Sequence, residues 1–111
     1  MTTDTRVFLR DIRPYFTPTS WDSLNGTATG AITLPHHVWW APGTSTFPLD
    51  QRHYVEMAYQ ALVVEGTTAD QEALLHPGLL IATWPRLRLP ERVRTIWEDK
   101  FPHLQHHHEQ S

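Results

Sequence analysis

Nine prolines limit where this chain of 111 residues can form helices, because an interior proline removes a backbone hydrogen bond and clashes with the preceding turn. Five of the nine precede residue 50, and the others stand at positions 77, 85, 90 and 102. The first half is therefore expected to be extended, and the second half to contain short helices between the prolines. A chain of this length has the size of one domain with one modest core.

Three segments of the first half show patterns of local structure. Residues 7–12 (VFLRDI) have the side-chain alternation of a short strand. Residues 19–26 offer Thr19 or Ser20 as the N-cap of a single helical turn that Gly26 would end. Residues 31–34 and 38–40 are rich in β-forming residues and are separated by a proline, which predicts strand structure at a sheet edge.

The second half begins with a strong helical pattern over residues 51–65. One face is apolar, and the opposite stripe is polar and consists of Arg52, Glu56 and Gln60. Asp50 is the expected N-cap, and Gly66 is the expected left-handed residue at the C-terminal end. Arg52 and Glu56 are four residues apart and are expected to form an exposed ion pair.

Three shorter helices are predicted after Gly66. Thr67 and Thr68 precede Asp70 and Gln71 by three residues each, a capping-box spacing that starts a helix ending near residue 75. Pro77 suits the first position of another helix, which should end at residue 84. A last helix is predicted to begin at Pro90 and to place apolar residues 93, 96, 97 and 101 on one face.

These elements predict a small single α+β domain over residues 1–102. Within it, residues 1–49 are expected to be extended and β-rich, and residues 50–102 to hold three to four short helices. The expected core includes Tyr59, Leu62, Leu80, Ile96 and Trp97. Residues 103–111 have no apolar periodicity, so they are expected to form a disordered tail.

Charge and hydropathy exclude several classes of protein. The formal net charge is only -3, which gives no overall attraction to nucleic acid or to an anionic membrane. No apolar run approaches the roughly 18 residues of a membrane span, and the N-terminal residues lack the pattern of a secretory signal. A cytoplasmic protein without a membrane partner is therefore expected.

The residue types of common catalytic sites are missing or badly placed. The chain has no cysteine, which excludes thiol nucleophiles and zinc thiolate sites. Its five glycines are scattered and form neither a phosphate-binding loop nor a nucleophile turn. The nearest carboxylate pairs, Asp70 with Glu72 and Glu98 with Asp99, are not arranged to share a proton. We therefore expect no enzyme activity, no catalytic residues and no cofactor.

The eight histidines do not predict a metal site either. His103, His106 and His107 have the spacing of one helical face, but Pro102 is expected to end the preceding helix. His36 and His37 are adjacent and would point to opposite faces of a strand, one at the surface and the other partly buried.

The stretch PGLLIATWPRLRLPERVRTIW, residues 77–97, concentrates four arginines between two apolar segments. Pro85 and Pro90 are expected to stiffen the RLRL linker, whose alternation places its arginines outward and Leu87 and Leu89 inward. Arginine pairs with carboxylates through two hydrogen bonds, and tryptophan is enriched in binding hot spots. The predicted partner-binding residues are Arg86, Arg88, Arg92, Arg94, Trp84 and Trp39.

DNA is the alternative partner for the cluster from Arg86 to Arg94. A small dimeric transcriptional regulator could place these arginines on phosphates, and its affinity would then fall steeply with salt. However, Pro90 and Glu91 would stand at the start of the reading helix, where a carboxylate faces phosphate. The same two residues suit an ordinary helix N-terminus.

Two strings carry a resemblance to a protein family. They are YQALVVEGT at residues 59–67 and WPRLRLPERVRTIW at residues 84–97. The chain resembles small actinobacterial antitoxin-like proteins encoded beside nucleotidyltransferase toxins of the abortive-infection type. The resemblance implies a non-catalytic protein-binding module that binds and restrains such a toxin. A homodimer is compatible with this role.

Overall fold

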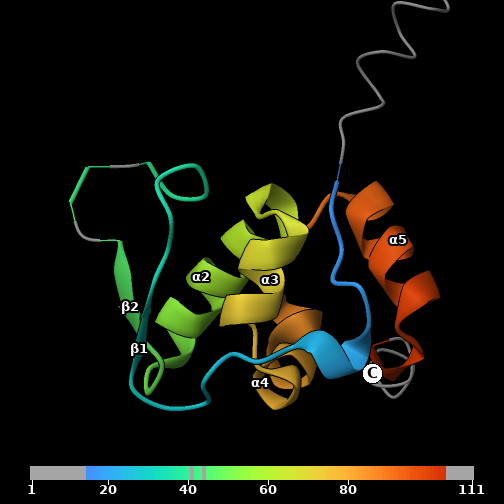
Figure 1. Ribbon diagram of the computed structural model, residues 1–111, viewed down its shortest axis with the longest axis horizontal. Helices are drawn as coiled ribbons and strands as arrows, with labels where there is room; N and C mark the ends of the chain where they lie inside the picture. Colours follow the sequence, from blue (N-terminus) through green and yellow to red (C-terminus); the bar gives the residue numbers. More distant parts are fainter. Residues whose placement is uncertain (1–14, 41, 44, 105–111) are drawn as a thin grey trace, which may run out of the picture.

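The structure, a computed structural model, describes residues 15–104 except residues 41 and 44. It is a single α+β domain, as predicted: a two-stranded antiparallel sheet lies at one end, and four α-helices form the rest (Figure 1). The strand predicted at residues 7–12 lies outside the described residues. Within the described residues, no helix combines the length and the apolar character that crossing a membrane requires.

The sheet is a short hairpin of β1 (Ala31–Thr33) and β2 (Thr46–Pro48). Ile32 pairs with Phe47 at its centre, and both side chains are buried in the core while their neighbours face outward. The prediction of a strand at 31–34 is therefore confirmed in position. The strand predicted at 38–40 is wrong, because the backbone N–H groups of Val38 and Trp39 both donate to the carbonyl of Pro35 and form a turn instead.

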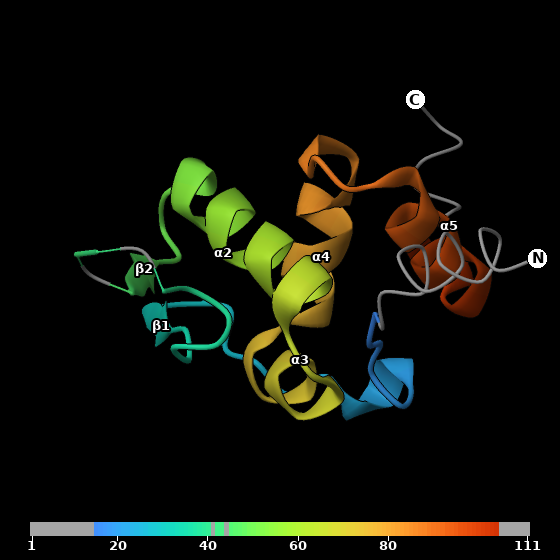
Figure 2. The same cartoon turned by 90° about the horizontal axis from the view of Figure 1, so that it is seen from above.

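Helix α2 (Arg52–Glu65) runs between the hairpin and the other helices (Figure 2). Its inner face supplies the buried residues Val55, Ala58, Tyr59, Leu62 and Val63. The N-cap is Gln51 and not Asp50, and it makes no side-chain capping bond. Gly66 ends the helix in an extended conformation, φ −77°, so the expected left-handed residue is not present there.

Tyr59 joins α2 to the start of α4 (Pro77–Thr83). Its hydroxyl accepts a hydrogen bond of 2.9 Å from the backbone N–H of His76. Burial of the phenol raises the pKa of Tyr59 to about 12, because the charged form cannot be solvated in the core. Tyr59, Leu62, Leu80 and Trp97 are fully buried as predicted, and Ile96 packs against the core while remaining partly exposed.

The predicted capping box is confirmed at the start of α3 (Thr68–Leu74). The Thr67 hydroxyl accepts from the backbone N–H of Asp70, whose carboxylate accepts from the backbone N–H of Thr67. The next residue, Gln71, is fully buried. Its amide nitrogen donates to backbone carbonyls of Phe16, Leu62 and Gly66, so it joins the N-terminal segment, α2 and α3.

Helix α4 begins at Pro77 as predicted, and His76 caps it by accepting from the backbone N–H groups of Gly78 and Leu79. The chain then makes a 3-10 turn, η2 (Trp84–Arg86), before the extended linker. Helix α5 (Glu91–Lys100) follows, with Pro90 at its N-cap instead of its first position. Val93 and Trp97 bury the apolar face of α5 as the sequence indicated.

The N-terminal described segment packs against α5 and α3. It contains the 3-10 turn η1 (Trp21–Ser23), at the place where one helical turn was predicted, with Ser20 at its N-cap but without a side-chain capping bond. Trp21 contacts Phe101 and stacks on His103 at 4.6 Å between ring centroids. Leu104 is fully buried. Residues 103 and 104, which were predicted to belong to a disordered tail, are ordered, because His103 stacks on Trp21 and Leu104 is buried in the core; residues 105–111 lie outside the described residues.

The backbone of Gly26 lies so close to the end of α3 that there is no room for a side chain. Its N–H donates to the carbonyl of Leu75, and a Cβ atom added to it would lie 2.3 Å from the carbonyl oxygen of Leu74. This contact explains why a glycine is needed here, although it does not end a helix.

Replacing Gly26 with alanine is expected to lower the free energy of unfolding by about 2 kcal/mol, because the added methyl forces backbone apart. Gly78→Ala is the matched control: its Cβ would meet only the His76 ring, at 3.1 Å, and alanine favours the helix. Urea unfolding of both variants measures the difference. Equal stabilities would show that the contact at Gly26 is not tight.

Candidate protein-docking groove

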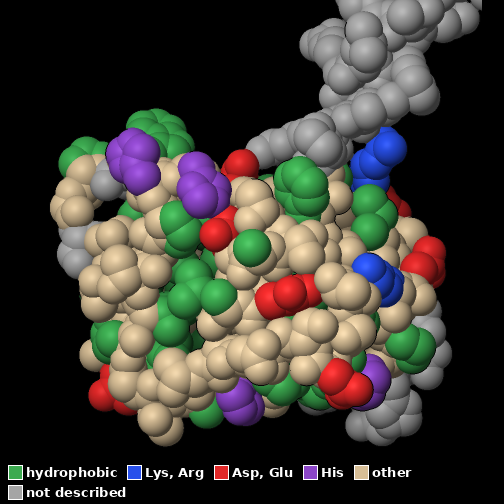
Figure 3. Space-filling model, viewed as in Figure 1, with side chains coloured by type: hydrophobic (Ala, Val, Ile, Leu, Met, Phe, Trp, Pro, Cys, Tyr) green, Lys and Arg blue, Asp and Glu red, His purple; other side chains and the backbone are tan. Residues whose placement is uncertain are grey.

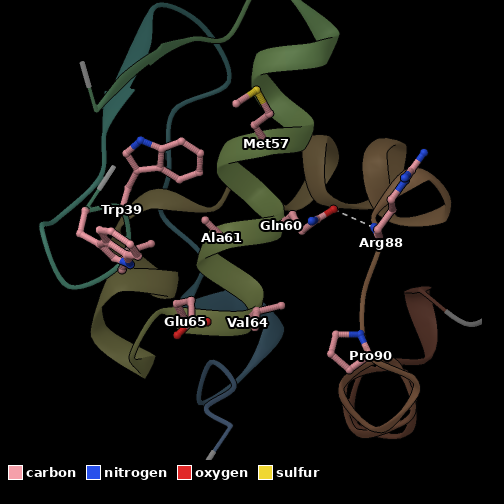
Figure 4. A pocket seen from close by; sticks show the side chains of 10 residues that line it. Trp39, Met57, Gln60, Ala61, Val64, Glu65, Arg88 and Pro90 are labelled. Carbon is pink, nitrogen blue, oxygen red and sulfur yellow. Dashed lines mark hydrogen bonds between the residues drawn. The ribbon is translucent and has the colours of Figure 1, made fainter. Parts of the chain in front are cut away.

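An open groove of about 510 Å³ lies along the outer side of α2 (Figure 4). We call it the α2 groove and define it by the residues that line it: Val38, Trp39, Trp40, Met57, Gln60, Ala61, Val64, Glu65, Arg88 and Pro90. The aromatic residues come from the loop after β1, and the arginine and proline come from the linker before α5. The α2 groove thus has one floor and two walls from distant segments of the chain.

The floor is a second stripe on α2, next to the stripe that faces the core. Met57, Gln60, Ala61 and Val64 follow the spacing i, i+3, i+4 and i+7, which places them on one side of a helix. Three of the four side chains are apolar, and Met57 is 36% exposed. Helix α2 is therefore apolar on two adjacent faces, one of which lies in the α2 groove.

The aromatic wall is held by contacts with the core. Val38 is buried, and Trp39 packs edge-to-face on Phe47 at 5.1 Å between ring centroids. Trp40 is 75% exposed, so it offers most of its indole surface to solvent. The predicted partner-binding residue Trp39 thus supports the wall, and its neighbour Trp40 is the more accessible of the two.

The opposite wall is the linker between η2 and α5. The backbone N–H of Arg88 donates to the side-chain oxygen of Gln60 at 2.8 Å, which fixes the linker to α2 (Figure 4). Leu87 is buried and Leu89 packs against the core, as the alternation predicted. The Arg88 side chain is exposed and makes no hydrogen bond or ion pair with any described residue.

Glu56 and Gln60 were expected on a polar outer stripe of α2, and the structure gives both another role. Glu56 lies 3.8 Å from the guanidinium of Arg86 and does not pair with Arg52. Gln60 accepts the Arg88 bond described above. Both side chains are partly buried beneath the linker. Two of the three residues of the polar stripe therefore hold the arginine linker, and only Arg52 is exposed.

Two of the four predicted arginines contact other groups of the same domain. Arg86 pairs with Glu56 and donates to the Ala82 carbonyl at 3.1 Å. Arg94 donates to the Leu87 carbonyl at 2.6 Å and lies over the Trp84 ring. Arg94, which was predicted to bind a partner, closes the turn between η2 and α5 in the structure.

Trp84 is also corrected, because its side chain is fully buried. Its indole N–H donates to Glu98 at 2.9 Å, and its ring packs against Trp97. A residue buried in this way belongs to the core and cannot reach a partner. Arg92, in contrast, is exposed on α5 and makes no hydrogen bond or ion pair with the described residues.

The loop that carries the aromatic wall is attached to α3 through His37. The His37 Nε2 atom lies 2.6 Å from the Asp70 carboxylate. Burial acts to raise the pKa of Asp70, but hydrogen bonds from Thr67 and His37 outweigh it and hold that pKa below its usual value of 3.8. His36 and His37 are both exposed, so the expectation that one would be partly buried is wrong.

The described residues show no arrangement for metal chemistry. Among residues 15–104, apart from the two that are not described, no three histidine or carboxylate side chains gather to hold an ion. His103 stacks on Trp21, and His106 and His107 lie outside the described residues.

Basic side chains are sparse on the face shown in Figure 3. Lys and Arg groups appear there only on the α5 side of the molecule, and other residues separate them. Lys100 is engaged on this side with the Thr17 hydroxyl, at 3.0 Å. Within the described atoms of this face, there is no continuous basic stripe of the kind that follows a DNA backbone.

No protein-family model, curated protein or solved structure matches the chain. Sequence reasoning named Trp39 and Arg88 but missed Trp40, Met57, Ala61 and Val64 as lining residues. The repeat at 57, 61 and 64 beside the core stripe was the available signal, because a helix with two apolar faces has one to offer a partner.

The contacts of Arg94 inside the domain predict that its side chain stabilises the fold. Arg94→Ala is expected to lower the free energy of unfolding by about 1.5 to 3 kcal/mol, because it leaves the Leu87 carbonyl without its charged donor. Arg92→Ala, which removes the same charge from the same helix, should change stability by less than about 0.5 kcal/mol. Thermal unfolding of both variants measures the difference. Equal losses of stability would show that the contacts of Arg94 do not stabilise the fold.

The Asp70 contacts predict a pH dependence of stability. The pKa of Asp70 is lowered in the folded state, so its contribution is present above about pH 4 and is lost as the pH falls through the folded-state pKa. Asp70→Asn should cost about 1 kcal/mol at about pH 7, and this difference should shrink in acid. Unfolding of both proteins in urea from about pH 7 to about pH 2 measures it. A constant difference would exclude the carboxylate as the cause.

Proposed function

We propose that the protein is a non-catalytic protein-binding module and that the α2 groove receives its partner. The observation that carries this proposal is Trp40, which is 75% exposed at the rim of a largely apolar groove. Indole surface in water is a cost that burial against a partner removes. Single exposed apolar residues are ordinary on protein surfaces, but here Trp40 lines the same groove as Met57 and the rest of the apolar floor.

The composition of the α2 groove supports a protein partner. Binding sites for proteins concentrate affinity in tryptophan, tyrosine and arginine around an apolar centre. Here Trp39 and Trp40 form one wall and Arg88 the other, and Met57, Ala61 and Val64 lie between them. The groove is open along its length, whereas a small ligand is usually enclosed over most of its surface.

The motifs at residues 59–67 and 84–97 give the partner its proposed identity. They resemble antitoxin-like proteins, so the partner is a nucleotidyltransferase-type toxin, and the protein restrains it in the cytoplasm. Both motifs contribute to the α2 groove: the first supplies Gln60, Ala61, Val64 and Glu65, and the second supplies Arg88 and Pro90. The resemblance and the geometry thus favour the same surface.

A DNA-binding regulator is the second candidate, and the guanidinium groups of Arg88 and Arg92, unpaired among the described residues, favour it. Two phosphate contacts give little affinity, and Arg86 and Arg94 already contact acceptors of the domain itself. Pro90 and Glu91 also occupy the start of α5, where a reading helix would meet phosphate. A protein partner therefore accounts for more of the surface.

The proposed function predicts that the tagged protein captures a nucleotidyltransferase-type toxin from its native host. Trp40→Ala should weaken the purified complex about 30-fold or more, as expected for a hot-spot tryptophan. Phe16→Ala is the matched control, since Phe16 is a 44% exposed aromatic outside the α2 groove, and it should have little effect.

The same purified protein is titrated with DNA from its own promoter at about 50 and about 200 mM salt. Tight promoter binding that falls steeply with salt, together with no captured protein, would replace the docking function by DNA regulation.

A further inference from the structure

The shape of the α2 groove suits the binding of another helix. Its floor is the helical stripe of Met57, Gln60, Ala61 and Val64, which presents a ridge and shallow grooves at helical spacing. Ala61 at the centre of this stripe is small, so a second backbone can approach there. The tryptophan wall and the linker wall stand on either side of the floor (Figure 4).

The backbone of Arg88 is fixed at the edge of the α2 groove, and its exposed side chain can reach an incoming group. Its backbone is fixed by the bond to Gln60, and the buried side chain of Leu87 and the ring of Pro90 restrict the chain on either side. Its guanidinium has no partner among the described residues. Little backbone entropy remains to be lost when this arginine binds, and its planar donors match a carboxylate.

We infer that the α2 groove binds an amphipathic α-helix of another protein, whose apolar face covers the floor and whose Asp or Glu pairs with Arg88. This inference rests on the proposed function and names the structure and charge of the partner segment. Amphipathic helices bind apolar grooves through side chains spaced three, four and seven residues apart. The partner residue is expected to be acidic because the guanidinium of Arg88 has no partner among the described residues and the rest of the lining is largely apolar.

The attachment of the linker sets where the carboxylate of the partner lies. The backbone N–H of Arg88 donates to Gln60 in the middle of the floor, so Arg88 is anchored beside the middle of α2. A carboxylate opposite Gln60 is therefore the one that lies beside Arg88. The acidic residue of the partner helix therefore packs beside the middle of α2 and not beside its C-terminal end.

The probe that tests this inference is a phage library of random peptides of about 16 residues, long enough for four helical turns, selected on the full-length protein. Enriched peptides should share apolar residues at helical spacing and one Asp or Glu, and circular dichroism should show helix formation on binding. The best peptide is then synthesised with that acid as Glu and as Gln.

Both peptides are titrated against the wild-type protein and against Arg88→Gln. The acid and Arg88 should be coupled by about tenfold in affinity in the double-mutant cycle. Arg92→Gln is the matched control, because Arg92 is also unpaired among the described residues but lies outside the α2 groove, and it should leave both affinities unchanged.

Other results would overturn the inference and leave the proposed function standing. One such result is a set of enriched peptides that bind without forming a helix, that contain no acidic residue, or whose affinity does not change in Arg88→Gln. Another is a selection that enriches no peptide although the host partner still requires Trp40. A protein that sediments as a dimer, and as a monomer after Trp40→Ala, would make a second copy the occupant. Loss of all protein capture in the host experiment would instead remove the proposed function itself.

Discussion

The structure depends on the burial of α2 from several sides at once. Its inner stripe forms the core, the hairpin covers one flank through Phe47, and the arginine linker rests on Glu56 and Gln60. Tyr59 adds a hydrogen bond from within the core to the start of α4. A chain of this size buries only a modest core, so one central helix shared by every layer is an economical solution. What remains of the surface of α2 becomes the floor of the groove.

The elements of the fold that could be predicted are those that local chemistry determines. The capping box at Thr67, the first-turn position of Pro77 and the apolar face of α5 each depend on residues a few positions apart. The second strand could not be predicted, because Thr46–Pro48 acquires its structure only by pairing with β1. Sheet pairing depends on residues far apart in the sequence. The β-prone run after Pro35 forms a turn because two of its N–H groups donate to the Pro35 carbonyl.

The candidate site shows the same division. The outward direction of Arg88 and the inward direction of Leu87 follow from alternation along the linker, and both are observed. Alternation cannot show which arginine meets an acceptor across the fold. Arg94 reaches the Leu87 carbonyl and Trp84 sinks beneath it because α5 folds back on η2. An arginine cluster in the sequence therefore separates in space into structural and exposed members, and only the contacts distinguish them.

The two walls of the α2 groove come from opposite halves of the chain, and each is held in place by few contacts: the aromatic wall by β2 and α3, and the linker wall by α2. The aromatic wall depends on Phe47 and on the link from His37 to Asp70, and the linker wall depends on Gln60. A ligand that spans both walls would bind the native state and not the unfolded chain, so its binding free energy would add to the stability of the domain. Occupancy would act as a non-covalent clasp between the hairpin half and the helical half.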